Sequence, residues 1–75
     1  MKIHLAGHLS WYQTEKKSWF EMELLSQTRL ADLLEQLGIP QGEVAIALVN
    51  GKPADMETVP LQEDVVELFP PAAGG

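Results

Sequence analysis

The sequence predicts a two-layer α+β domain in which one helix crosses a mixed sheet of about five strands. Three observations support this prediction: apolar residues alternate with a period of two near both ends of the chain, a leucine stripe with helical spacing lies between them, and glycines and prolines separate the segments. With 75 residues and no cysteine, the chain builds one core without disulfides.

The first two strands are predicted at residues 1–5 and 20–24, where apolar and polar residues alternate. Their apolar positions are Met1, Ile3, Leu5, Phe20, Met22 and Leu24. Two neighbouring strands joined by a loop form an antiparallel hairpin. The loop, residues 7–18, is long for a hairpin and carries Trp11 and Tyr12. Together with Trp19, we expect these aromatic residues to cover one end of the core rather than to bind a ligand.

The helix is predicted by leucines at positions 30, 33, 34 and 37, which fall on one stripe. Thr28 precedes this stripe and is the expected N-cap. Gly38 follows it and allows the left-handed conformation that ends helices, while Pro40 prevents continuation. A helix of about ten residues is too short to be stable alone, so it packs on the sheet.

Three further strands are predicted after the helix. Residues 43–49 are apolar on both faces, Asn50-Gly51 fits a type I′ turn, and residues 52–54 return alongside. Residues 65–69 form the last strand, which Pro70-Pro71 ends. The right-handed crossover rule places this strand parallel to the first, near the middle of the sheet.

Period two assigns residues to the two faces of the sheet. The helix-facing side is expected to hold Ile3, Leu5, Phe20, Met22, Leu24, Ile46, Leu48, Val66 and Leu68. The opposite side is expected to hold His4, Glu21, Ala47, Glu67 and Phe69. A large aromatic residue on an uncovered face is poorly explained by the isolated domain. Phe69 is therefore expected to dock a partner, with Glu67 and Ala47 beside it.

The charge of the chain narrows the class of partner. A net charge of −6 argues against nucleic acid as a partner. After Leu30 the chain has eight acidic residues and one basic residue, Lys52, so this half suits a basic protein surface. An equal alternative is that the charge only keeps the protein soluble. No run of residues would span a bilayer, so we expect a cytoplasmic protein that binds no membrane. His4 and His8 have no third ligand at a recognisable spacing, so no metal site is expected.

The last six residues, Pro70-Pro71-Ala72-Ala73-Gly74-Gly75, have no side chain that could hold a core, accept a proton or bind a metal. Composition alone favours a plain disordered terminus. The alternative is a functional tail that acts through its backbone and carboxylate, and that reaches roughly 20 Å when extended. The predicted organisation is a globular domain at residues 1–69 and an extended, flexible tail at residues 70–75.

Three motifs together resemble a known family: residues 49–51 (Val-Asn-Gly), residues 63–65 (Glu-Asp-Val), and Leu-Phe-Pro-Pro at residues 68–71 ahead of the terminal Gly74-Gly75. They are similar to those of the ubiquitin-like sulfur carriers of the MoaD/ThiS family, which include the molybdopterin synthase small subunit and the thiamine-pathway carrier. The Phe-Pro-Pro stretch is more similar to the molybdopterin branch. This resemblance implies a β-grasp fold and a C-terminal glycine that an ATP-using activating enzyme adenylates and converts to a thiocarboxylate.

The resemblance further implies a sulfur carrier for molybdopterin biosynthesis, in the pathway of the molybdenum or tungsten cofactor, that serves as the small synthase subunit. Such a protein binds no cofactor and is not catalytic alone; its partners are an adenylating enzyme, the large synthase subunit and a sulfur donor protein. Alternatives are a thiamine-thiazole sulfur carrier, a protein modifier joined to lysine through Gly75, and an interaction domain with an inert tail. The reacting terminus is Gly75 with Gly74, and the expected partner-binding residues are Glu67, Phe69, Pro70, Pro71, Ala72, Ala73 and Ala47.

Overall fold

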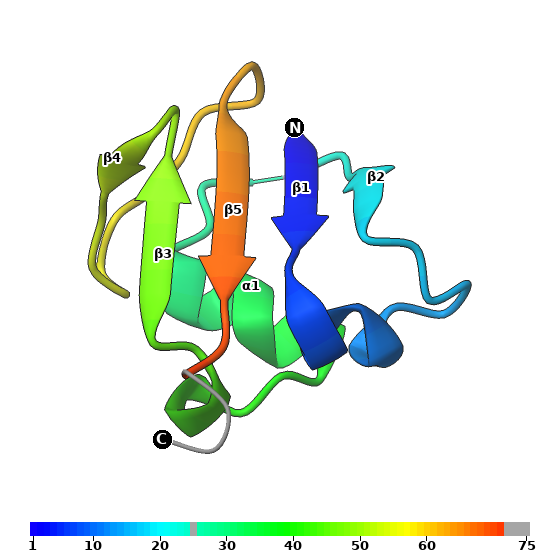
Figure 1. Cartoon of the computed structure of the whole chain (residues 1–75). Coiled ribbons are helices and arrows are strands. Elements are labelled where there is room, and N and C mark those ends of the chain that lie inside the picture. The colour runs from blue at the N-terminus through cyan, green and yellow to red at the C-terminus, as the bar shows by residue number, and fades with distance from the viewer. Residues whose placement is uncertain (25, 72–75) are drawn as a thin grey trace.

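A single helix, α1 (Leu30–Leu37), covers one face of a five-stranded sheet, and the other face is open (Figure 1). The structure is a computed structural model that describes residues 1–24 and 26–71. The strands are β1 (Lys2–Leu5), β2 (Trp19–Glu21), β3 (Ile46–Val49), β4 (Lys52–Pro53) and β5 (Val65–Phe69). Two short 3-10 helices, η1 (Gly7–Tyr12) and η2 (Gln41–Glu43), complete the described elements. The predicted two-layer α+β architecture is confirmed.

The sheet has the order β2-β1-β5-β3-β4, with β5 in the centre. β5 pairs in parallel with β1 and antiparallel with β3, and the two hairpins β1–β2 and β3–β4 are antiparallel. The predicted place of the last strand is therefore confirmed. Several strands are shorter than expected. β2 ends at Glu21, and β3 begins only at Ile46, because η2 includes Glu43 and residues 44–45 lie outside the strand.

The core lies between α1 and the sheet. The helix contributes Leu30, Leu33 and Leu34, none more than 1% exposed, as the leucine spacing predicted. The sheet contributes Ile3, Leu5, Ala47, Val66 and Leu68, and the loops contribute Leu9 and Ile39. The expected N-cap is wrong. Thr28 is buried and donates to the Ser26 carbonyl, whereas Arg29 occupies the cap position and makes no side-chain capping bond to the helix.

The first N–H groups of α1 are satisfied by a distant loop instead of a cap side chain. Leu30 and Ala31 donate to the carbonyls of Thr58 and Met56, at 2.9 and 3.0 Å. These groups need partners because the first turn of a helix offers no carbonyl to its own N–H groups. Arg29, which donates to Glu57 in the same loop, reinforces the junction. The helix start thus depends on a contact between segments remote in sequence.

The helix ends where the sequence predicted, at Gly38, whose φ of 76° is left-handed. We expect Gly38→Ala to lower the free energy of unfolding by about 1 kcal/mol, because a Cβ is strained in this conformation. Gly42 is a matched control, since its φ is not positive and a Cβ added there would meet no atom within 4 Å. Gly42→Ala should leave stability unchanged or raise it by up to about 1 kcal/mol. Urea denaturation measures both, and equal effects would contradict the prediction.

The faces of β3 are the reverse of those predicted. Ile46 lies opposite Phe69, and Ala47 lies opposite the buried Leu68. Directly opposed residues share a face, so Ile46 points away from the helix while Ala47, 5% exposed, points into the core. Leu48 accompanies Ile46 on the open side. The assignment of Ala47 to a partner-binding face is therefore wrong, because a strand that is apolar on both sides carries no signal for which side is buried.

The turn after β3 is stabilised by a contact with the start of β5. Asn50 and Gly51 have φ values of 53° and 81°, as the predicted type I′ turn requires. The Asn50 amide donates to the Asp64 carboxylate, and its oxygen accepts from the Val65 N–H, both at 2.8 Å. A hydrogen bond from the Leu61 N–H has the larger effect on the pKa of Asp64, and one from the Asn50 amide has the smaller. Both lower this pKa below its usual value. Asp64 therefore stabilises the turn between β3 and β4.

The loop before β2 folds as η1 and contributes a buried leucine. Leu9 is fully buried, whereas Trp11 is 74% exposed. Tyr12 and Trp19 are exposed as well. The expectation that these three aromatic residues cover the core is therefore wrong, since Leu9 does so in their place.

Candidate functional site

The root of the C-terminal tail lies at the end of the central strand. The Leu68 and Phe69 carbonyls accept hydrogen bonds from the N–H groups of Ala6 and Ala45, at 2.9 and 2.8 Å. Pro70 follows and cannot donate to the ladder, so strand pairing stops there. The chain therefore leaves the sheet from its middle, held by a neighbour on each side.

Close packing against the first loop fixes the tail root further. Gly7 has a φ of 55°, and a Cβ at this position would lie 3.1 Å from Cγ of Pro70. Glycine accommodates both the left-handed conformation and this close approach without strain. Pro71 is the last residue that the structure describes, and it is exposed. The predicted reacting and tail residues Ala72, Ala73, Gly74 and Gly75 lie outside the described residues, and their roles stay predictions.

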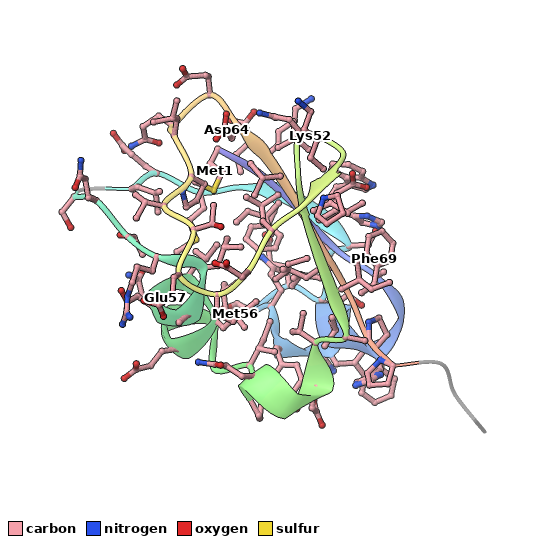
Figure 2. The ribbon with its side chains drawn as sticks, turned by 90° about the vertical axis from the view of Figure 1, so that its left-hand side faces the viewer. Met1, Lys52, Met56, Glu57, Asp64 and Phe69 are labelled. Atoms are coloured by element: carbon pink, nitrogen blue, oxygen red, sulfur yellow. The ribbon has the colours of Figure 1, made fainter. Side chains whose placement is uncertain are left out.

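The face of the sheet opposite α1, here called the open face, ends at the tail root. It carries Trp19, His4, Glu67, Phe69, Ile46 and Leu48, placed by the strand registers. Figure 2 shows the sheet from the side, with Phe69 on the side away from α1. Its position on the uncovered face is thus confirmed. Ile46 and Trp19, 53% and 49% exposed, flank it as apolar surface.

Aromatic contacts order part of the open face. The His4 ring stacks on Trp19 with centroids 4.4 Å apart and meets Phe69 edge to face at 5.9 Å. Nδ1 of His4 lies 3.3 Å from Oε2 of Glu67. These residues therefore form a preformed aromatic surface with one carboxylate within it. Such a surface suits an apolar partner surface that bears a polar group. Sequence reasoning missed Ile46 and Leu48 because both faces of β3 are apolar.

The histidines, the other candidate ligands, do not form a metal site among the described residues. Among residues 1–24 and 26–71, no three His, Asp or Glu side chains come together as a metal ion would need. His4 and His8 instead approach separate carboxylates, those of Glu67 and Glu43. The described helices include none with the length and apolarity to cross a membrane.

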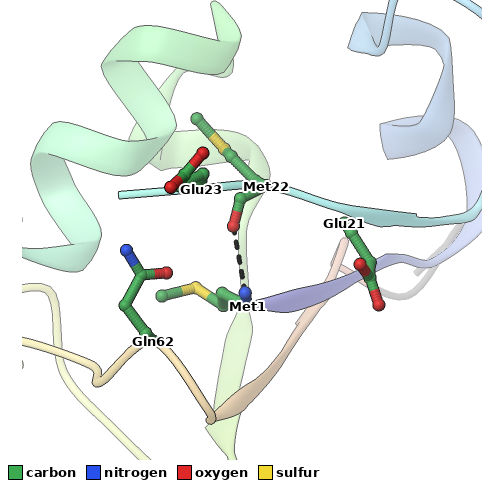
Figure 3. Close-up of a pocket in the computed structure, with 5 residues that line it drawn as sticks. All are labelled: Met1, Glu21, Met22, Glu23 and Gln62. Carbon is green, nitrogen blue, oxygen red and sulfur yellow. Dashed lines mark hydrogen bonds between the residues drawn. The ribbon is translucent and has the colours of Figure 1, made fainter. Parts of the chain in front are cut away.

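A cavity of about 380 Å³ lies at the opposite end of the sheet (Figure 3). It is lined by Met1, Glu21, Met22, Glu23 and Gln62. Inside it the N-terminal ammonium donates to the Met22 carbonyl at 3.0 Å. Because β1 and β5 are parallel, the cavity lies by the start of β1, away from the tail root, and it takes no part in the site.

Comparisons with known proteins agree with this geometry. A family model described as the ThiS family matches residues 11–75. Among solved structures, the crystal structure of SAMP1 from Haloferax volcanii matches with a TM-score of 0.74 and 19% sequence identity, over 100% of this chain and 98% of that chain. A search of curated proteins gives no match. The structural likeness supports the β-grasp fold that the motifs implied.

Proposed function

Because this chain belongs to the ThiS family of ubiquitin-like proteins, we propose that it is a sulfur carrier whose Gly75 is adenylated and then thiocarboxylated. We propose further that it delivers this sulfur for molybdopterin biosynthesis as the small subunit of the synthase. The observation that carries the proposal is the exit of the Phe69-Pro70-Pro71 segment from the central strand, beside an open apolar face. This geometry offers a docking surface and a tether at the same end of the molecule.

The proposed chemistry needs no side chain from the tail. A carboxylate is a poor electrophile, so the activating enzyme first lets a Gly75 oxygen attack the α-phosphorus of ATP and expel pyrophosphate. A sulfide-equivalent nucleophile then attacks the acyl carbon and expels AMP, which leaves a thiocarboxylate. The chain supplies the acyl carbon and its placement, while ATP and catalytic groups belong to the partner. We propose a cytoplasmic location, which is consistent with the need of the activating enzyme for ATP.

Docking of the body is proposed to occur through the open face. Phe69 and Glu67 lie there beside the tail root, and Pro70 and Pro71 stiffen the segment that leads away from it. The activating enzyme, the large synthase subunit and the sulfur donor would approach from this end. A net charge of −6 favours partner surfaces that are basic around an apolar centre.

Two other pathways use the same activated glycine. A thiamine-thiazole sulfur carrier is favoured by the family model that matches residues 11–75, whereas the Phe-Pro-Pro segment favours the molybdopterin branch. Conjugation through Gly75 to a lysine amine is the third candidate. The two carrier pathways differ in the molecule that accepts the sulfur, whereas conjugation transfers the acyl group of Gly75 to an amine. The product therefore identifies the pathway.

Intact-mass analysis of the protein from its native cell tests the proposal. We expect a fraction with the mass increase of an oxygen-to-sulfur replacement, located by fragmentation at Gly75. Isopeptide-linked adducts would instead support a protein modifier. In a reconstitution with the large synthase subunit, the thiocarboxylated chain is expected to yield molybdopterin, and the same chain carrying a plain carboxylate is the control. Product only with a thiazole-forming enzyme would assign the thiamine branch.

A further inference from the structure

A second exposed aromatic surface lies on η1, outside the hydrophobic core. It consists of His8, Trp11 and Tyr12, here called the aromatic corner, which line a cavity of about 210 Å³. Trp11 is the most exposed large apolar side chain among the described residues, at 74%. The Lys16 ammonium lies over its indole, 5.7 Å from the ring centroid. Exposed tryptophan beside a cavity is typical of protein contact surfaces.

The aromatic corner is held in a fixed position. Leu9, in the middle of η1, is fully buried and anchors this segment to the core. The Tyr12 hydroxyl donates to the Glu43 carboxylate of η2, and Nε2 of His8 lies 3.5 Å from the same carboxylate. The bond to Glu43 raises the pKa of Tyr12 above its usual value. The exposure of Trp11 is therefore a property of an anchored element, not of a loose loop.

Proximity to the tail root places the aromatic corner within reach of any enzyme that binds the tail. Gly7, the first residue of η1, packs against Pro70. Trp11 comes four residues later, about 8 Å along a 3-10 helix at ~2.0 Å per residue. The four residues after Pro71 reach at most about 14 Å. An enzyme that acts on Gly75 must therefore bring its surface to within that distance of Pro71.

The size of an ordinary interface leads to the same conclusion. A stable interface covers about 800 Å² on each partner, equivalent to a disc of about 16 Å radius. The accessible surface of this protein is 4737 Å², so such an interface occupies roughly a sixth of it. An interface of this size centred on the tail root extends far enough to reach Trp11.

We propose that the aromatic corner is a second contact surface for the enzyme that receives the tail, and that an apolar side chain of that enzyme enters the cavity between His8, Trp11 and Tyr12. This inference rests on the proposed function, which requires an enzyme that binds the tail. The lining favours an apolar occupant because two aromatic rings form most of it, and the Lys16 ammonium over Trp11 disfavours a cation. The tail of the chain itself offers only the methyl groups of Ala72 and Ala73, too little to fill the cavity.

Substitution of Trp11 tests the contact. We expect Trp11→Ala to weaken binding to the purified activating enzyme from the same organism about tenfold or more by calorimetric titration, with an unchanged melting temperature because the side chain is exposed. Leu61→Ala is the matched control: Leu61 is 58% exposed but precedes β5, at the opposite end of that strand from the tail. It should bind like the native chain. Native affinity for Trp11→Ala would overturn the inference.

Labelling identifies what occupies the cavity. The small protein alone is prepared with 5-fluorotryptophan, and Trp11→Phe and Trp19→Phe assign its two fluorine resonances. We expect the Trp11 resonance to shift when the enzyme is added, and to stay in place when residues 72–75 are removed from the free chain. A shift on removal would mean that the tail itself fills the cavity, and would overturn the inference. A native chain that the enzyme neither binds nor adenylates would remove the proposed function, whereas normal adenylation with no effect of Trp11→Ala removes this inference alone.

Discussion

Removal of Gly75 is expected to abolish adenylation and leave the fold intact. The reacting carboxylate must lie about 3–3.5 Å from the α-phosphorus, whereas loss of one residue changes the reach by about 3.3–3.6 Å. The fold should not change, because every buried core residue in the described part of the chain precedes the tail, the last being Leu68. Exchange of labelled pyrophosphate into ATP, catalysed by the activating enzyme with this chain as acceptor, measures adenylation. Circular dichroism and the melting temperature check the fold.

Two companion variants separate reach from chemistry. A chain with one residue added after Gly75 keeps a terminal carboxylate but moves it past the reactive position, so it should also be inactive. Gly75→Ala keeps both the length and the carboxylate and is expected to retain measurable exchange. If the extended chain were activated as fast as the native one, the carboxylate would not be held at a fixed reach, and the tether mechanism would be wrong.

Patterns among neighbouring residues were sufficient to predict the helix and the turns that depend on those residues alone. Leucine spacing located α1, Gly38 ended it, and Asn50-Gly51 formed the expected turn. The central place of β5 followed from the handedness of crossover connections, a rule that depends on element order alone. Residues 65–69 and the prolines after them located the tail root in the same way.

Features that depend on contacts between distant segments could not be predicted. Thr28 is a good N-cap residue, yet the carbonyls of Met56 and Thr58 already satisfy the helix start. The faces of β3 are decided by the register with β5, which brings Ala47 opposite Leu68. Composition also gave no reason to choose Leu9 over Trp11 as the core residue of its loop, since both are apolar.

The site, like the fold, was predicted where it depends on one segment and not where it depends on contacts between distant segments. The open face around Phe69 was predicted from the alternation in the last strand, because Glu67 between Val66 and Leu68 indicates which side is polar. Ile46 and Leu48 completed that face only when the register was known. The aromatic corner needed the contacts of η1 with Pro70 and Glu43, which join segments more than 30 residues apart.

Phe69 provides the second large expected effect. Its ring lies on the open face beside the tail root, in edge-to-face contact with His4 and opposite the exposed Ile46. A partner that covers this face would bury the ring, and aromatic anchors of this kind often cost at least ~2 kcal/mol of binding free energy when truncated. Phe69→Ala is therefore expected to weaken association with the activating enzyme or the large synthase subunit about thirtyfold or more.

The neighbouring residue provides a control on the opposite face of the same strand. Leu68 is fully buried, so Leu68→Ala should lower the free energy of unfolding by roughly 2–5 kcal/mol. Phe69→Ala should cost only about 1 kcal/mol, the value of one aromatic contact. Titration of each folded variant with the partner, paired with urea denaturation, separates the two effects. If Phe69→Ala bound with native affinity, Phe69 would take no part in docking. If it lost as much stability as Leu68→Ala, Phe69 would be a core residue. In either case docking would have to involve another surface.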